Sequence, residues 1–229
     1  MKKPILFNNP NKFAPKLGLD YSNGAILVKG YQQYIVYKDS IKPDSNSYDL
    51  LTKYILLKDV LNEDIAGKTI LDLGANSGFF TFLSYQNGGK CTAIDLDPDY
   101  INIINEVSNY FNFNILIKKQ NITDVNHPSD IVIALSLIHW VYSCTSIFNS
   151  MEKLVLFFRS VTKEHLIIEW IDNEDNAIKC FNHLDHNSNF TNNTYNHQEF
   201  MKQMNIHFTK IVKLGETRKN TRLLYKASV

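Results

Sequence analysis

The sequence has few of the residues that mark disulfide frameworks, zinc sites and membrane spans. Its 229 residues include three cysteines, Cys91, Cys144 and Cys180, and none of them lies in a Cys-x-x-Cys pattern. An odd number of widely spaced cysteines argues against both a disulfide framework and a zinc site. The longest apolar stretch, residues 131–141, is interrupted by polar side chains and is shorter than the roughly 20 residues that cross a bilayer. We therefore expect no membrane span.

The sequence also lacks a marked excess of charge and a secretory signal. Its 24 Lys and Arg residues against 23 Asp and Glu give a net charge of +1, which does not favour a dedicated nucleic-acid binder. Only residues 4–7 separate the N-terminal lysines from a run of asparagines, too short for the apolar part of a signal peptide. We expect a soluble, cytoplasmic protein. Residues 201–229 are locally basic, which indicates either a solvated hairpin face or an anion site.

Short apolar runs alternate with amphipathic segments through the middle of the chain. Strands are expected at residues 69–73, 90–94, 114–117, 131–135 and 165–170, and helices at residues 78–86, 98–111 and 146–161. Two last strand-like runs, residues 208–214 and 221–226, are joined by too few residues for a helical crossover, so they pair antiparallel. The predicted fold is α/β and doubly wound. It has a mostly parallel seven-stranded sheet with an antiparallel C-terminal hairpin strand, and helices on both faces.

The N-terminal part of the sequence shows no sustained period. We interpret residues 1–46 as an irregular arm or lid with one short strand at residues 31–37. From residue 47 the apolar side chains recur at helical spacing, which predicts a helix before the first strand of the sheet. Residues 47–229 then form the α/β domain, and the chain is a single domain overall.

A glycine-containing turn follows the first predicted strand of the sheet. Asp72, Gly74, Asn76 and Gly78 stand at alternate positions. A dinucleotide fingerprint would need Gly-x-Gly-x-x-Gly, but Asn76 and Phe79 occupy its second and third glycine positions. The stretch resembles the class I S-adenosylmethionine-dependent methyltransferases, which carry Asp/Glu-x-Gly-x-Gly-x-Gly after their first strand. Asn76 stands where the family has its middle glycine, and a strand-to-helix turn with a capping Asn is the structural alternative.

The resemblance implies a Rossmann-like methyltransferase domain whose cofactor is S-adenosylmethionine and whose product is S-adenosylhomocysteine. This cofactor has an ammonium and a sulfonium but no phosphate, so the turn must bring the backbone close and place a carboxylate, here Asp72, near positive charge. Asp95 ends the second strand, where ribose hydroxyls bind in folds of this kind. Asp97 is a second ribose candidate or caps the next helix. The full set of cofactor-binding candidates is Asp72, Gly74, Ala75, Asn76, Gly78, Asp95, Leu96, Asn121, Ile122, Ala134 and Leu135.

Two segments extend the resemblance beyond the turn. Asn121 and Ile122 follow the third strand, where the family contacts the adenine, although a plain turn explains them equally well. Ala134 and Leu135 end the fourth strand, where the family lines the methionine moiety and the acceptor.

Candidate catalytic residues follow the fourth and fifth strands. His139 is the candidate general base because imidazole titrates near neutrality, and a structural histidine is the alternative. Glu169 ends the fifth strand and either orients an acceptor hydroxyl or assists His139. We assign substrate binding to Trp140, Trp170, Asp172 and Tyr195, because aromatic faces stack on sugars and bases. Core packing is the alternative for the tryptophans, and helix capping for Asp172.

The acceptor is inferred from motifs that are missing. The sequence has no Asn/Asp-Pro-Pro-Tyr for adenine amino groups, no Pro-Cys for pyrimidines, and no acids arranged as in magnesium-dependent catechol enzymes. His183, Asp185 and His186 form a metal-like cluster in the sequence, but the ligand set is not convincingly completed, so we expect no metal. The resemblance then implies metal-independent O-methyl transfer to a small molecule or sugar unit. An RNA or nucleotide methyltransferase and a non-catalytic cofactor-binding subunit are the alternatives.

Overall fold

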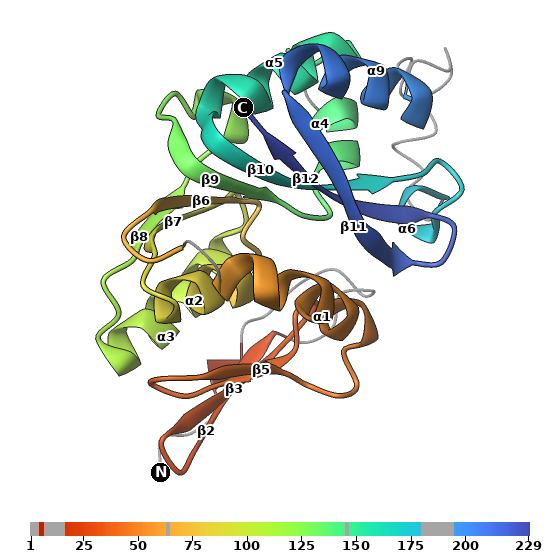
Figure 1. Cartoon of the computed structure of the whole chain (residues 1–229). Coiled ribbons are helices and arrows are strands. Elements are labelled where there is room, and N and C mark those ends of the chain that lie inside the picture. Colours follow the sequence, from red (N-terminus) through yellow and green to blue (C-terminus); the bar gives the residue numbers. More distant parts are fainter. Residues whose placement is uncertain (1–4, 7–16, 63–64, 145–146, 180–194) are drawn as a thin grey trace. The chain divides into compact units, whose positions relative to one another are not determined.

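The computed structural model of the chain describes residues 5–6, 17–62, 65–144, 147–179 and 195–229 (Figure 1). Within it the chain forms two compact units, Met1–Asn121 and Ile122–Val229. Cys180 and the group His183, Asp185 and His186 lie outside the described residues. Each unit is described separately below.

The first unit begins with a five-stranded antiparallel sheet. Its strands are β1 (Ile5–Leu6), β2 (Gly18–Ser22), β3 (Ala25–Lys29), β4 (Tyr34–Val36) and β5 (Ile41–Pro43), and they pair in chain order. The expectation of an irregular arm was therefore wrong, apart from β4, which lies within the strand predicted at residues 31–37. The overlooked signal is Asn23-Gly24, which joins β2 to β3 with φ values of 45° and 78°. Asn-Gly is a strong hairpin signal because both residues tolerate positive φ.

The rest of the first unit follows the predicted alternation. Its elements are α1 (Tyr48–Asn62), β6 (Thr69–Leu73), α2 (Phe79–Gln86), β7 (Lys90–Asp95), α3 (Pro98–Phe111) and β8 (Leu116–Lys119). β7 pairs in parallel with β6 on one side and β8 on the other. Asp97 caps α3, since its carboxylate accepts a hydrogen bond from the Asp99 backbone N–H at 2.8 Å, and Pro98 follows as the first helical residue.

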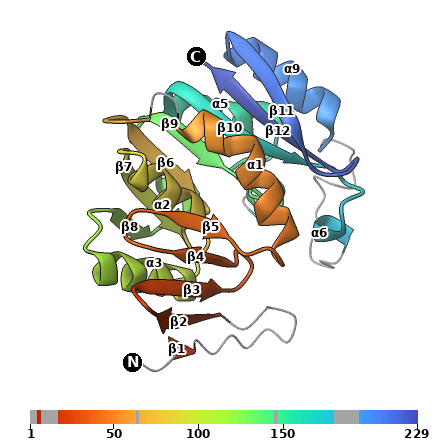
Figure 2. The ribbon, with the colours of Figure 1, turned by 60° about the horizontal axis from the view of Figure 1, so that its bottom comes forward.

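Helix α2 lies between the two sheets of the first unit, as Figures 1 and 2 show. Its sequence, FFTFLSYQ, contains four apolar residues among the first five, and its first six residues are buried. The ring of Tyr34 on β4 packs against those of Phe79 and Phe82, with centroids 5.4 and 6.4 Å apart. Six consecutive buried residues span more than one helical turn, so the helix is covered on all sides, and the N-terminal sheet supplies the second cover.

The second unit contains the remaining strands and helices. They are β9 (Ser129–Ala134), α4 (Ile138–Cys144), α5 (Met151–Val161), β10 (Thr162–Ile171), α6 (Asn176–Lys179), α9 (His197–His207), β11 (Lys210–Arg218) and β12 (Arg222–Ser228), after a 3₁₀ turn at Ile122–Asp124. β9 and β10 are parallel, while β12 is antiparallel to both β10 and β11. The sheet order is β11-β12-β10-β9-β6-β7-β8. The predicted α/β fold, with a mostly parallel seven-stranded sheet and an antiparallel C-terminal hairpin, is confirmed.

Three helices of the second unit were not predicted. For the segments of α4, α6 and α9 the sequence analysis predicted no helix. Asn196 caps α9 by accepting from the Glu199 backbone N–H at 2.8 Å, so Asn-x-x-Glu was a readable helix start. Within the described part of the chain, no helix combines the length and the apolar character that crossing a bilayer requires.

Candidate cofactor site

The glycine turn owes its residue pattern to its backbone conformation. Gly74, Asn76 and Gly78 have φ values of 68°, 54° and 91°, so three alternate residues are left-handed. Glycine adopts this conformation freely, and asparagine does so more readily than other residues with a side chain. The backbone N–H groups of Gly74 and Ala75 both donate to the Ile94 carbonyl of β7, at 2.9 and 3.0 Å. Asn76 is therefore a conformationally matched replacement for the family's middle glycine.

A side chain at Gly78 would be strained and crowded. An added Cβ would lie 3.0 Å from Ile104 Cγ1 and 3.0 Å from Phe82 Cε2. We expect Gly78→Ala to lower the free energy of unfolding by about 2 kcal/mol, from left-handed strain plus crowding. Gly67→Ala is the matched control, because Gly67 is also left-handed but has open space around its Cβ position. The control should lose about 1 kcal/mol. Urea denaturation measures both, and equal losses would contradict the crowding.

Asp95 connects the end of β7 to this turn. Its Oδ2 accepts from the Asn76 backbone N–H at 2.8 Å, and its Oδ1 accepts from the Asp97 backbone N–H at 2.9 Å. Burial raises the pKa of the Asp95 carboxyl, and these backbone hydrogen bonds counteract the rise. A carboxylate has about four acceptor sites, so Asp95 keeps acceptor capacity for a ligand hydroxyl. The carboxylate thus lies at the turn, and its contact with ribose remains a prediction.

Asp72 is a buried carboxyl group on β6. Only 4% of its surface is exposed, and its Oδ2 accepts from the Thr81 hydroxyl at 2.6 Å. Burial raises the pKa of Asp72 to about 7; the Thr81 hydrogen bond lowers it, and the nearby charge of Asp95 raises it. A carboxyl group with this pKa responds to a nearby cation by ionising. That is the property that an ammonium or sulfonium ligand would use.

The sequence analysis missed several residues that hold the turn. The Tyr100 hydroxyl hydrogen-bonds the Asn76 side chain. Gln32 Oε1 accepts from the Phe79 backbone N–H at 3.1 Å, and the Tyr34 hydroxyl donates to the Ser77 carbonyl. Gln32 and Tyr34 lie 47 and 43 residues before their partners, so no local spacing could have identified them.

Three further cofactor candidates are Leu96 and the two adenine candidates, Asn121 and Ile122. Leu96, directly after Asp95, has 57% of its surface exposed. Asn121 ends the first unit and is half-buried, while Ile122 begins the second unit in the 3₁₀ turn. Their contacts with a cofactor remain predictions.

Glu169 fixes the segment that follows β9. Glu169 is fully buried. Its Oε2 accepts hydrogen bonds from the backbone N–H and the hydroxyl of Ser136, at 2.8 and 3.0 Å. Its Oε1 accepts a hydrogen bond from the Thr217 hydroxyl. Ser136 is held at a φ of 50°, in the left-handed region. It follows Ala134 and Leu135, the predicted lining of the methionine moiety, of which Ala134 is fully buried and Leu135 half-buried. The hydrogen bonds of Glu169 thus give it an anchoring role at this candidate segment.

His139 and Trp140 both belong to α4. Only 1% of the His139 surface is exposed, and its ring centroid lies 5.5 Å from that of Trp140, which is half-buried. A general base must reach the acceptor hydroxyl. His139 therefore serves as a base only when the acceptor reaches the interior position that the ring occupies.

Trp170 and Tyr195 lie in the interior of the second unit. Their rings stack with centroids 4.5 Å apart and an angle of 19° between the ring planes. Phe200 of α9 also stacks on Trp170, with centroids 5.2 Å apart. The Tyr195 hydroxyl donates a hydrogen bond to the Ile171 carbonyl at 2.8 Å. Trp170 is 1% exposed and Tyr195 is 0% exposed. This arrangement corresponds to the core-packing alternative and presents neither ring to an acceptor.

Asp172 forms a turn, and a buried ion pair follows it. Asp172 accepts from the Glu174 backbone N–H at 3.1 Å. The Asp175 carboxylate accepts hydrogen bonds from Nε and Nη2 of Arg222, both at 2.9 Å, and from the Thr221 hydroxyl at 2.7 Å. The hydrogen bonds from Arg222 and Thr221 hold the pKa of Asp175 far below its usual range. Part of the basic C-terminal region is thus internally paired: Arg218 also lies 3.5 Å from Asp175, Lys202 pairs with Glu199, and Lys213 pairs with Glu216.

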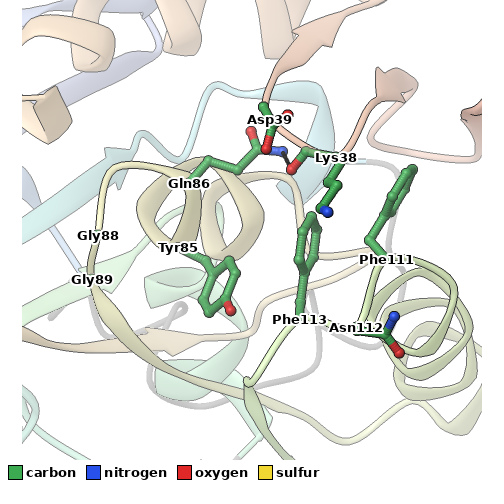
Figure 3. Close-up of a pocket in the computed structure, with 9 residues that line it drawn as sticks. All are labelled: Lys38, Asp39, Tyr85, Gln86, Gly88, Gly89, Phe111, Asn112 and Phe113. Carbon is green, nitrogen blue, oxygen red and sulfur yellow. Dashed lines mark hydrogen bonds between the residues drawn. The ribbon is translucent and has the colours of Figure 1, made fainter.

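A surface pocket of about 450 Å³ lies away from the turn (Figure 3). It is bordered by Tyr85 and Gln86 at the far end of α2, by Phe111 and Phe113 at the end of α3, and by Lys38. The turn is at the start of α2, and this pocket is at its end. None of its lining residues is among the cofactor-binding candidates or among the catalytic and substrate-binding candidates.

Comparisons with known proteins find a family-model match in the central part of the chain. Residues 71–156 match the family model of a methyltransferase domain. The match begins in β6 and contains the glycine turn, Asp95 and His139. No curated protein sequence matches the chain significantly.

Several solved structures share the fold. The bifunctional kinase-methyltransferase WbdD aligns with a TM-score of 0.57 at 20% identity, over 82% of this chain and 40% of the WbdD chain. Magnesium protoporphyrin IX methyltransferase (ChlM) from Synechocystis PCC 6803, with bound S-adenosylmethionine, aligns with a TM-score of 0.56 at 11% identity, over 79% of both chains. The PH0226 protein from Pyrococcus horikoshii OT3 aligns with a TM-score of 0.54 at 17% identity, over 81% of this chain and 92% of the PH0226 chain. The chain spans less than half the length of the WbdD chain.

Proposed function

We propose that this chain, whose residues 71–156 match the family model of a methyltransferase domain, is a class I S-adenosylmethionine-dependent methyltransferase that methylates an oxygen atom of a small molecule or sugar unit. The family-model match of residues 71–156 and the fold shared with ChlM, whose structure holds S-adenosylmethionine, support the domain family and the cofactor. The oxygen acceptor, the substrate class and the independence of a metal are the proposal. The observation that carries it is the left-handed turn of Gly74, Asn76 and Gly78, which Asp95 binds at 2.8 Å.

The groups at this turn fit the cofactor in charge and hydrogen-bonding capacity. Asp72 is a carboxyl group whose pKa of about 7 lets it ionise beside a cation. Asp95 keeps acceptor capacity for ribose hydroxyls after binding the turn. Exposed Leu96 beside it offers apolar surface to the adenine ring. These residues would hold the cofactor, and its chemical contribution is a methyl group already activated by the sulfonium.

The chain itself has to position the acceptor and accept its proton. Orientation of two reactants is a large part of the rate enhancement in such transfers, and a rigid site preserves it. Glu169 supplies rigidity by fixing Ser136 through two hydrogen bonds. His139 is the proposed base for an acceptor hydroxyl. Metal independence is supported by Asp130, which lies in the first half of β9 and pairs with Lys163 at 3.5 Å, so it does not supply an acid at the end of that strand.

Calorimetric titration tests the cofactor part of this proposal. We expect S-adenosylmethionine and S-adenosylhomocysteine to bind with dissociation constants of about micromolar, or about −8 kcal/mol. NAD should give no heat, because the turn lacks the dinucleotide fingerprint. Binding of NAD without the sulfur compounds would overturn the proposal.

A radiolabelled methyl-transfer screen then tests the acceptor. We expect label in sugars or small hydroxyl compounds, with the rate unchanged by EDTA. Label in RNA, with strongly salt-dependent binding, would identify the nucleic-acid alternative. Cofactor binding without turnover on any acceptor would indicate a non-catalytic subunit.

A further inference from the structure

Helix α2 begins without a capping side chain of its own. Its N-cap residue is Gly78, and no local side chain hydrogen-bonds the first turn. The first backbone N–H groups of a helix have no partner inside the helix, so they require acceptors from elsewhere. The usual capping residues Ser, Thr and Asp are unsuited to position 78, because it is left-handed and tightly packed.

The missing acceptor comes from a connection between two strands of the N-terminal sheet. Gln32, in the connection between β3 and β4, places its Oε1 3.1 Å from the Phe79 backbone N, the first residue of α2. The backbone carbonyl of Gln32 also accepts from the Ser77 hydroxyl at 3.3 Å. Two residues later, the Tyr34 hydroxyl donates to the Ser77 carbonyl. Gln32 and Tyr34 therefore hydrogen-bond the residues on both sides of Gly78, Ser77 and Phe79.

The turn needs such external support because its conformation is costly. A left-handed residue with a side chain is strained, and strained backbone persists only where the surroundings determine it. Asp95 fixes Asn76 from the side of β7. Gln32 fixes the following residues from the opposite sheet, so the turn is held between the two.

We propose that Gln32 is a positioning residue of the cofactor site, which acts by capping α2 across the fold and holding the turn in its cofactor-binding conformation. This inference rests on the proposed function. It gives the N-terminal sheet a role in cofactor affinity, whereas the sequence analysis assigned residues 1–46 to an arm or lid.

Two substitutions at Gln32 and one at its neighbour test the proposal. Gln32→Met keeps the length of the side chain but removes the acceptor. Gln32→Glu keeps an acceptor, and a negative charge is favourable at a helix N-terminus. Gln33→Met is the matched control, because the Gln33 side chain hydrogen-bonds Asp44 and not the turn.

The two measurements are S-adenosylhomocysteine affinity by calorimetry and amide hydrogen exchange of the peptide that covers residues 74–82. Gln32→Met should weaken binding about tenfold and speed exchange in this peptide, because the Phe79 N–H loses its partner. Gln32→Glu should restore both values to near those of the wild type, and Gln33→Met should change neither. A general loss of stability would not be rescued by glutamate.

The outcomes separate this inference from the proposed function. If the wild type binds S-adenosylhomocysteine and Gln32→Met binds it equally well, the positioning role is overturned and the proposed function stands. Faster exchange with unchanged affinity also overturns it, since the cap would then be structural only. If the wild type binds neither sulfur compound, the proposed function fails, and the positioning role for the cofactor fails with it.

Discussion

Replacement of Asp95 by alanine is expected to weaken the binding of S-adenosylhomocysteine by about 1–3 kcal/mol, or roughly 5-fold to 150-fold. The substitution removes the acceptor of the Asn76 backbone N–H and of the Asp97 backbone N–H. It also removes the proposed partner of the ribose hydroxyls. Both losses act in the same direction, because the turn becomes less well held and the ligand loses a charged hydrogen-bonding group. Calorimetry on the folded variant measures the effect.

Asp97→Asn distinguishes the two neighbouring acids. An asparagine at position 97 still caps α3, because its amide oxygen can accept from the Asp99 N–H. Cofactor affinity should therefore stay within about twofold of the wild type if Asp97 only caps the helix. A similar loss of cofactor affinity in Asp95→Ala and Asp97→Asn would assign a ribose contact to Asp97 as well. Unchanged affinity in Asp95→Ala would remove Asp95 from the cofactor site.

The parts of the fold that the sequence predicted are those with local physical causes. The apolar runs that became β6 and β7 are short, buried and followed by turn residues, so periodicity located them within one residue. Pro98 after Asp97 marked the start of α3 for the same reason. The alternate glycine positions of the turn could be read because left-handed backbone restricts residue type directly.

The missed features depend on contacts between distant segments or on a local signal that was overlooked. Gln32 could not be assigned because its partner Phe79 is 47 residues away. The five-stranded sheet was missed although Asn23-Gly24 is a hairpin signal. Trp170 was ambiguous because a tryptophan at a strand end either stacks on a ligand or packs in the core. The fully buried Tyr195, whose ring stacks on that of Trp170, distinguishes core packing from ligand stacking.

The second large effect is a pH dependence that comes from Asp72. In the folded protein burial raises the pKa of this carboxyl to about 7, whereas the unfolded chain holds it near 3.8. Between these values the folded state binds the proton more tightly, so the stability of the free protein falls as pH rises from about 4 to about 7. A difference of about three units corresponds to roughly 4 kcal/mol at most. Denaturant unfolding at several pH values should show this fall in the wild type and lose it in Asp72→Asn.

Cofactor binding should respond to the same group with the opposite sign. A cationic ligand favours the ionised carboxylate, so affinity should rise with pH up to about 7, by up to about tenfold per unit, and then level off. Thr81→Val is an informative variant, because the Thr81 hydrogen bond lowers the pKa of Asp72. Its loss should move the midpoint of the affinity profile to higher pH, and Asp72→Asn should flatten the profile between pH 5 and 7. A wild-type affinity that does not change with pH would mean that the cation of the cofactor does not interact with Asp72, and the acid would then be assigned to holding Thr81 at the start of α2.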